Sequence, residues 1–129
     1  MVKDAIDEFS DRNDIPSHID QRRVQMLGTS GTVTTLGAIS LNLPRYLRSR
    51  VDGLDLSFHE IQNISSSLLH MSEEERSSHP CIGINRADLV IAGCAILEAL
   101  CELWPVGQIT IADRGIREGI LLNLMRKNP

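Results

Sequence analysis

The segment that most constrains the fold of this chain is a glycine-rich turn, Gly28-Thr29-Ser30-Gly31-Thr32. The turn connects an extended segment, residues 23–27, to an apolar segment of helical character, residues 33–41. Glycines let the backbone approach a ligand closely, and free N–H groups at a helix N-terminus attract negative charge. The hydroxyl side chains of the turn can also donate to phosphate oxygens. The turn therefore predicts either a phosphate-binding loop or a helix capped by Ser or Thr, and its residues leave both open.

Composition and charge limit the classes of protein to which the chain can belong. Its 129 residues suffice for one domain, and 42% apolar with 23% charged residues is ordinary for a soluble one. A net charge of −4 argues against broad binding to nucleic acid. No uncharged run approaches the ~20 residues of a membrane span. The three cysteines lack C-x-x-C spacing, so we expect a cytoplasmic protein with reduced thiols and no metal site. From the net charge and the absence of a long apolar run, we expect no affinity for nucleic acid or membranes.

The predicted elements alternate in the manner of an α/β fold. Residues 1–20 are polar and predict an N-terminal helix and loop, whereas residues 21–129 form the remaining domain. The first strand and helix are followed, near the other end, by a second short strand at residues 108–112. Only two strands are clear, and a sheet usually has more. We therefore expect parallel strands and packed helices that form part of a larger fold.

Three further helices are predicted from capping and from apolar spacing. Ser57 followed by Glu60 forms a capping box and marks a helix start. Residues 87–104 are apolar on nearly every face, which predicts a central helix packed on more than one side. The last helix, residues 116–125, is predicted to place its apolar side chains on an inner face.

A second turn, residues 113–119, repeats the arrangement of the first, because a strand again runs into the start of a helix. Ligands of open α/β sheets bind outside the carboxyl ends of the strands, so the two turns are predicted to line one crevice. Glu118 complements the helix dipole, whereas Arg117 opposes it and is therefore expected to have a partner. Arg86, before the central helix, is predicted either to contact a phosphate or to pair with an acid. A capped terminal helix with surface charges is the alternative interpretation of the second turn.

Taken together, these elements resemble the C-terminal part of the exopolyphosphatase/guanosine pentaphosphate phosphohydrolase (Ppx/GppA) family. The resemblance covers about residues 26–122 and depends on the order and spacing of several short motifs. These motifs are the turn at residues 28–32 leading into Thr35-Leu36, Glu75-Arg76 followed by Pro80, Arg86-Ala87-Asp88 with Gly93 and Ile96-Leu97, and Gly115-Ile116-Arg117-Glu118-Gly119.

The resemblance implies the fold of actin, hexokinase and the heat-shock chaperone ATPases, in which the substrate lies between two ribonuclease-H-like lobes. This chain would be the incomplete second lobe, with few strands and packed helices. By the same resemblance, Gly28, Thr29, Ser30, Gly31 and Thr32 would face a phosphate. Arg86 and Arg117 would contact the anionic substrate, and Gly115, Glu118 and Gly119 would form the closing turn near the interlobe hinge.

The sequence also departs from the family pattern. Cys81 stands where the family commonly has Gly, and Ile116 stands where it has Leu. The N-terminal lobe of the family, with an Asp-containing phosphate loop, an Asp-x-Gly-Gly-Gly-Ser-type loop and a glutamate proposed to activate water, has no counterpart here. We therefore expect this chain to be a fragment of a larger enzyme, and we identify no catalytic residue within it. Mg²⁺ is expected in the full enzyme and is not expected to be held by this chain alone.

The implied function is release of terminal phosphate from polyphosphate or from guanosine pentaphosphate, and the sequence does not separate the two substrates. The expected partners are polyphosphate or guanosine penta- or tetraphosphate, together with the missing N-terminal lobe. One alternative is a non-catalytic module that binds a phosphorylated nucleotide or a protein. Another is a structural fragment that forms a homodimer through the surface that the missing lobe would cover.

Overall fold

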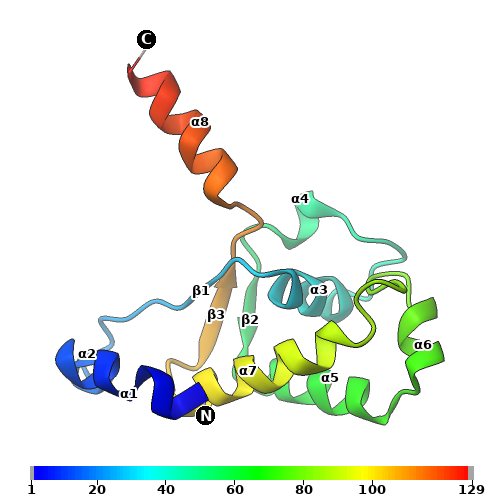
Figure 1. The fold of residues 1–129 in the computed structure, drawn as a ribbon, viewed down its shortest axis with the longest axis horizontal. Coiled ribbons are helices and arrows are strands. Elements are labelled where there is room, and N and C mark those ends of the chain that lie inside the picture. Colours follow the sequence, from blue (N-terminus) through cyan, green and yellow to red (C-terminus); the bar gives the residue numbers. More distant parts are fainter. Residues whose placement is uncertain (1, 128–129) are drawn as a thin grey trace.

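The computed structural model describes residues 2–127 and shows a small central sheet with helices packed against it (Figure 1). Three helices, α3, α5 and α7, cover one face of the sheet, and the last helix, α8, projects away from the body. In chain order the elements are α1 (Val2–Arg12), α2 (Ile15–Asp20), β1 (Leu27–Gly28), α3 (Gly31–Ser40), α4 (Arg48–Val51), β2 (Asp55–Ser57), α5 (Phe58–His70), α6 (Glu73–Ser78), α7 (Leu89–Leu103), β3 (Gln108–Ile111) and α8 (Ile116–Lys127).

The sheet has the strand order β1-β3-β2. Strands β1 and β3 are parallel, with Leu27 opposite Thr110 and Gly28 opposite Ile111. Strand β2 is antiparallel to β3 and places Leu56 opposite Ile109. Within the described part of the chain, no strand pairs with the other edge of β1. The expected α/β class with few strands and a parallel pair is confirmed. Of the extended segment predicted at residues 23–27, only residue 27 belongs to a strand.

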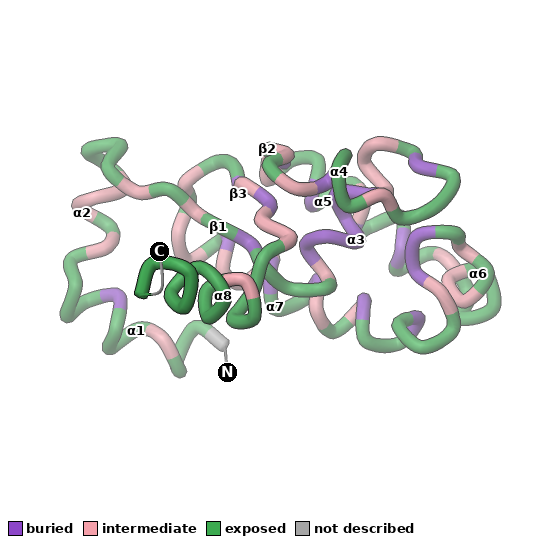
Figure 2. Tube along the Cα trace, turned by 90° about the horizontal axis from the view of Figure 1, so that it is seen from above, coloured by how far each residue is buried: buried purple, intermediate pink, exposed green. Residues whose placement is uncertain are grey.

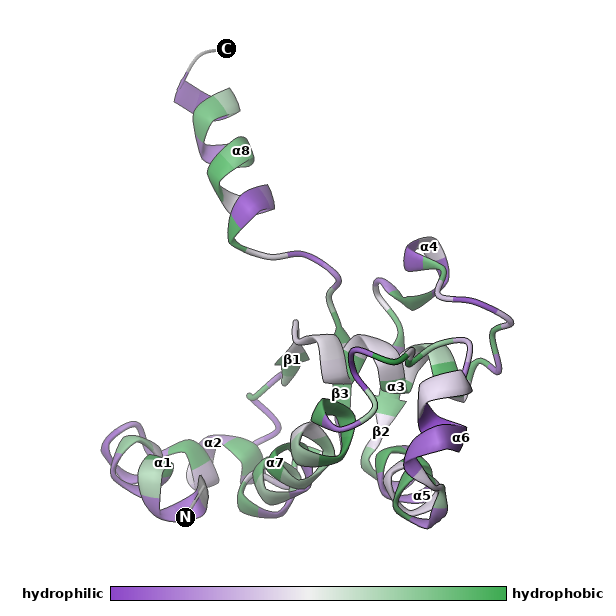
Figure 3. Cartoon of the chain, turned by 45° about the vertical axis from the view of Figure 1, so that its right-hand side comes forward, coloured by the Kyte–Doolittle hydropathy of each residue, from purple (hydrophilic) through white to green (hydrophobic). Residues whose placement is uncertain are grey.

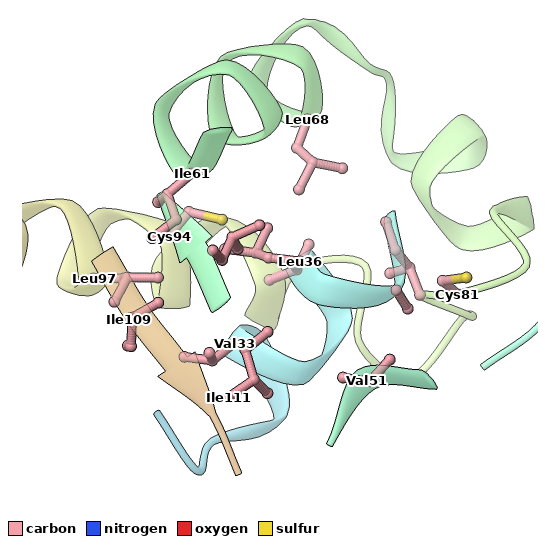
Figure 4. Close-up of a cluster of buried hydrophobic side chains, with 14 of the residues drawn as sticks. Val33, Leu36, Val51, Ile61, Leu68, Cys81, Cys94, Leu97, Ile109 and Ile111 are labelled. Atoms are coloured by element: carbon pink, nitrogen blue, oxygen red, sulfur yellow. The ribbon is translucent and has the colours of Figure 1, made fainter. Parts of the chain in front are cut away.

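The core lies between the inner face of the sheet and the three covering helices (Figure 4). Strand alternation explains the contribution of β3, because Ile109 and Ile111 are buried while Gln108 is exposed. The three cysteines are free, buried thiols that belong to this core, and burial raises the pKa of Cys101 to about 11. Other buried members are Val33 and Leu36 from α3, Ile61 and Leu68 from α5, and Cys94 and Leu97 from α7.

Local capping fixes where two helices begin. The Ser57–Glu60 capping box is present at the start of α5, as the sequence predicts: Ser57 N donates to Glu60 Oε2 at 2.9 Å and Glu60 N to Ser57 Oγ at 3.2 Å. Ser72 and Glu75 form a second capping box and begin the short helix α6. Residues 73–76 therefore belong to a helix of their own rather than to the end of the preceding one.

The N-terminal helix is tied to the C-terminal end of α7. Trp104 Nε1 donates to Ser10 Oγ at 2.9 Å, and the Trp104 and Phe9 rings meet edge to face with centroids 6.4 Å apart. Lys3 Nζ and Glu102 Oε2 form an ion pair at 2.5 Å. Residues 2–12 therefore pack on the domain instead of forming a separate appendage.

One expectation about helix burial is wrong, and a second is confirmed. Helix α8 buries no residue, although an inner apolar face was expected (Figures 2 and 3). Helix α7 contacts α1, α3 and α5, as expected of a helix packed on more than one side, but it leaves Leu89 and Ile96 exposed. The reason is that no described element packs against these surfaces. The apolar side chains of α8, each at least 52% exposed, are Ile116, Ile120, Leu121, Leu122, Leu124 and Met125.

Candidate functional site

The glycine-rich loop, residues 28–32, lies at the carboxyl end of β1 and opens α3. Ser30 is the N-cap of α3, and its Oγ accepts a hydrogen bond from Val33 N at 3.4 Å. Within residues 2–127, the amides of Gly31 and Thr32 have no hydrogen-bond acceptor, and Thr29 is exposed. Capping and ligand binding are therefore compatible here, because the cap uses one hydroxyl and leaves the amides of the first turn free.

Gly28 has a packing role as well as a place in this loop. It is buried, and its carbonyl accepts a hydrogen bond from Ala112 N at 2.9 Å. A methyl group on its α-carbon would lie 2.6 Å from Val33 Cγ1 and 2.7 Å from Ile109 Cδ1. Substitution of Gly28 therefore disturbs the core along with the loop.

We expect Gly28→Ala to lower the free energy of unfolding by about 1–3 kcal/mol, because the added methyl overpacks the contact between α3 and β3. Thr29→Ala, one residue further on and exposed, should change stability by less than about 0.5 kcal/mol. Urea unfolding of both variants measures the difference. Equal stabilities for the two variants would contradict the tight contact, and only Thr29→Ala is a clean probe of ligand binding.

Arg86 lies beside the N-terminus of α3. A methyl group built on Gly31 would be 3.7 Å from Arg86 Nη1, which places the guanidinium next to the free amides of the loop. Gly31, Thr32, Thr35 and Arg86 line the same cavity of about 200 Å³. Across the described residues, the Arg86 guanidinium forms no ion pair, so the structure does not give it the acidic partner that one interpretation of the sequence supplied.

The second turn lies next to the first, at the carboxyl end of β3. Thr29 lines a cavity of about 310 Å³ together with Arg114 and Arg117, and a larger one of about 670 Å³ that extends along α8 past Gly119. The two turns thus line shared cavities at the carboxyl ends of the parallel strands. Arg86 and Arg117 lie in different cavities on either side of the glycine-rich loop.

Arg48, which the sequence did not single out, holds the second turn in place. Its Nη2 donates to the carbonyl oxygen of Asp113 and contacts Glu118 Oε1 at 3.1 Å, and its Nε lies 3.4 Å from Asp113 Oδ2. Tyr46 donates its hydroxyl to Asp113 Oδ2 at 2.6 Å, and burial followed by this contact raises the pKa of Tyr46 to about 12. Arg48 and Asp113 are 65 residues apart, so no local spacing signals their contact.

Asp52 completes this ionic network. Its carboxylate accepts hydrogen bonds from Asp113 N at 2.9 Å and from Arg114 Nη2 at 2.8 Å. The Arg114 hydrogen bond and then the Asp113 amide hold the pKa of Asp52 below its usual range. The charges of Arg48 and Arg114 are therefore balanced by carboxylates. Among the described arginines that line cavities next to the glycine-rich loop, Arg86 and Arg117 are the ones without an ion pair.

Glu118 fixes the start of α8. Its Oε2 accepts from Gly115 N at 2.8 Å, and Arg48 donates to the other oxygen. The backbone amides of Gly115 and Glu118, followed by Arg48, lower the pKa of Glu118 to about 2. Hydrogen bonds from the backbone of the closing turn to the Glu118 carboxylate therefore hold this turn in shape. The carboxylate is ionised at neutral pH.

Because the pKa of Glu118 is lowered on folding, its contribution to stability is complete above about pH 4.5 and is lost as the pH falls toward about 2. We expect the Glu118 carboxyl carbon to titrate near pH 2 in an NMR experiment. In Arg48→Ala the midpoint should rise only partly toward 4.5, since the backbone amides are the larger cause. A midpoint near 4.5 in the unsubstituted chain would contradict the structure.

Within residues 2–127, the carboxylates of the second turn are bonded to other groups of the chain. No group of three or more His, Cys, Asp or Glu side chains comes together within residues 2–127. Asp113 and Glu118, the carboxylates of the second turn, are both paired with Arg48, and Glu118 also accepts a hydrogen bond from Gly115 N. Mg²⁺ prefers several free oxygen ligands, so these two side chains are poor candidates to hold it.

The fold and the two turns place the chain in a known class of protein. A small sheet with a parallel strand pair, helices on one face and a crevice at the strand ends is part of a ribonuclease-H-like lobe of the actin-like ATPase class. The chain belongs to the Ppx/GppA phosphatase family, whose sequence model matches residues 2–128. The match therefore includes the N-terminal segment that packs on Trp104. No curated protein sequence matches the chain significantly.

Solved structures support the same assignment. A Ppx/GppA family member from Aquifex aeolicus is 28% identical, with a TM-score of 0.75 over 82% of this chain and 35% of that structure. An exopolyphosphatase-like protein is 26% identical, with a TM-score of 0.72 over 89% of this chain and 41% of that structure. An exopolyphosphatase from Cytophaga hutchinsonii shares the fold at 22% identity and a TM-score of 0.72, over 98% and 41% of the two chains.

The chain thus spans between about a third and two-fifths of the length of these structures. Among the helices of residues 2–127, none combines the length and the apolar content needed to cross a bilayer.

Proposed function

We propose that this chain supplies half of the active site of a phosphoanhydride hydrolase that releases terminal phosphate from polyphosphate or guanosine pentaphosphate. The observation that carries the proposal is the position of the Arg86 guanidinium, beside the free first-turn amides of α3. A phosphate at this point would accept hydrogen bonds from backbone N–H groups and from a cation that is not committed to an acid. Membership of the Ppx/GppA phosphatase family supports this class of substrate. The free, buried thiols support a cytoplasmic location.

In this proposal the chain binds and orients the substrate. The amides of Gly31 and Thr32 and the Thr29 hydroxyl hold phosphate oxygens at one end of the crevice, and Arg86 offsets their negative charge. Arg117, in the neighbouring cavity, contacts the next phosphates of an extended chain. Phosphoryl transfer depends largely on positioning and on charge stabilisation, so these contacts matter without any covalent step. The group that activates water and the ligands of Mg²⁺ belong, in this proposal, to the other lobe.

In this proposal the other lobe packs on the open surfaces of the chain. The free edge of β1, a cavity of about 440 Å³ lined by Leu27, Ile96 and Leu100, and the apolar side chains of α8 all lie exposed. A short helix gains most of its stability from packing of its apolar side chains, so α8 is expected to be covered by another element. The remaining parts of the longer relatives provide enough polypeptide to cover these surfaces. A second copy of this chain is the alternative cover, and light scattering distinguishes a homodimer from a monomer.

A chimaera tests the proposal. The segment of the Aquifex aeolicus relative that matches this chain is replaced by residues 2–128, and phosphate release from polyphosphate and guanosine pentaphosphate is measured with Mg²⁺. We expect turnover by the chimaera, a loss of about 100-fold on Arg86→Gln, and no change on Arg126→Gln, an exposed arginine at the far end of α8. A folded chimaera without turnover would overturn the proposal. Turnover by the isolated chain would show that it forms a complete site.

A second function is favoured by one specific observation: in the described part of the chain, both carboxylates of the second turn are paired with Arg48. In that case the chain binds a phosphorylated nucleotide and does not hydrolyse it. Calorimetric titration of the isolated chain with guanosine tetraphosphate tests this function. Binding in the absence of any activity in the chimaera would favour the module, and absence of binding at millimolar ligand would exclude it.

A further inference from the structure

A half-buried arginine of α6, Arg76, connects the end of α5 to the segment that contains Arg86. Arg76, in α6, donates from Nε to the carbonyl oxygen of Ala87 at 3.0 Å. Its Nη1 donates to the carbonyls of Met71, at 2.5 Å, and Leu68, at 3.3 Å. The last two carbonyls lie at the C-terminal end of α5, where unpaired carbonyl oxygens favour a cation. The contact thus joins the end of α5 to the segment that precedes α7.

Ala87 is the point at which this contact reaches the candidate site. It is 2% exposed and directly follows Arg86 in the sequence. Residues 79–88 form turns and loop, so the location of Arg86 depends on what holds this segment. Cys81 anchors the beginning of the segment, since its thiol donates to the carbonyl of Leu43 at 3.2 Å. Arg76 anchors the end of the segment.

We propose that Arg76 is a positioning residue, which fixes Ala87 and thereby holds the Arg86 guanidinium beside Gly31. The inference rests on the proposed function, in which Arg86 binds phosphate. The hydrogen bonds of Arg76 end on Leu68, Met71 and Ala87, so its effect on the glycine-rich loop passes through Arg86. Arginine suits this task because its planar fork bonds several carbonyls at once, whereas lysine presents a single ammonium.

The test follows the position of Arg86 in the isolated chain. Nuclear Overhauser contacts between the Arg86 side chain and the Gly31 α-protons are measured by NMR, and tripolyphosphate binding is followed at the Gly31 amide. We expect Arg76→Lys to abolish the contacts and to weaken tripolyphosphate binding roughly tenfold. The matched control is Ile61→Val, a core substitution in α5 that lowers stability and should leave both readouts unchanged.

Each outcome decides one of the two proposals. If Arg76→Lys lowers the melting temperature but keeps the Arg86–Gly31 contacts and the affinity, Arg76 is merely structural and the inference is overturned. If the contacts are lost in Arg76→Lys while the unsubstituted chain does not bind tripolyphosphate, the positioning of Arg86 stands and the proposed phosphate role fails. Loss of the contacts in Ile61→Val as well would also overturn the inference, because any destabilisation would then move Arg86.

Discussion

Gly93→Ala is expected to lower the free energy of unfolding by about 2 kcal/mol, although alanine is the better helix former by about 1 kcal/mol. Gly93 lies in α7 at the point where this helix crosses the first turn of α3. A methyl group on its α-carbon would overlap Thr32 Oγ1 and lie 2.8 Å from Thr32 Cγ2. Threonine is stiff at χ1, so the helices must separate. Urea unfolding measures the loss.

A double substitution separates this contact from a general effect of the alanine. Thr32→Ala removes Oγ1 and Cγ2, which the new methyl meets most closely, and leaves Cβ at 2.9 Å, so Gly93→Ala should cost about 1 kcal/mol less in that background. The helix propensity of residue 93 is the same in both backgrounds. If Gly93→Ala stabilises the unsubstituted chain, the contact between α3 and α7 is looser than the structure shows.

Trp104→Ala should detach α1 from the domain at a cost of about 3 kcal/mol. The indole provides both the ring contact with Phe9 and the hydrogen bond to Ser10 Oγ. Because the affected contacts are local, the amides of residues 3–12 should exchange with solvent much faster while those of β3 stay protected. Hydrogen exchange of the two regions measures the effect.

Trp104→Phe is the matched control, since it keeps an aromatic ring against Phe9 and removes only the N–H donor. It should cost about 1 kcal/mol and leave α1 attached. Ser10→Ala should have a similar effect, because Ser10 is buried and loses the same hydrogen bond. If Trp104→Ala leaves the protection of residues 3–12 unchanged, α1 is held by other contacts.

Much of the fold follows from local signals in the sequence. The Ser57–Glu60 capping box, the apolar periodicity of α5 and the glycine turn before α3 each act over a few residues, and the structure contains all three elements. The neighbouring positions of the two turns also follow, because a parallel strand pair brings its carboxyl ends together. The family resemblance, confirmed by the match over residues 2–128, could likewise be recognised from short motifs.

The parts that could not be predicted depend on contacts between distant residues. Nothing near Arg48 in the sequence indicates that it bonds to Asp113 and Glu118, and the contacts of Arg76 reach Ala87 across a loop. The exposure of α8 was missed for a different reason. An apolar pattern predicts that a helix is buried but does not name the surface that covers it, and the described residues contain no such surface.

The strand order β1-β3-β2 has a consequence for how the chain acquires its structure. Within residues 2–127, the two edge strands pair only with β3, which begins at residue 108, so no ladder of this sheet can form before residue 108 has been synthesised. Leu27, for example, can pair with Thr110 only after residue 110 has been added to the chain. Helices α3, α5 and α7 can form and collapse together earlier, as local structure is fast and distant pairing is slow. We therefore expect a ribosome-bound chain that ends before residue 108 to expose the apolar side of these helices that faces the sheet, which is the kind of surface that chaperones bind.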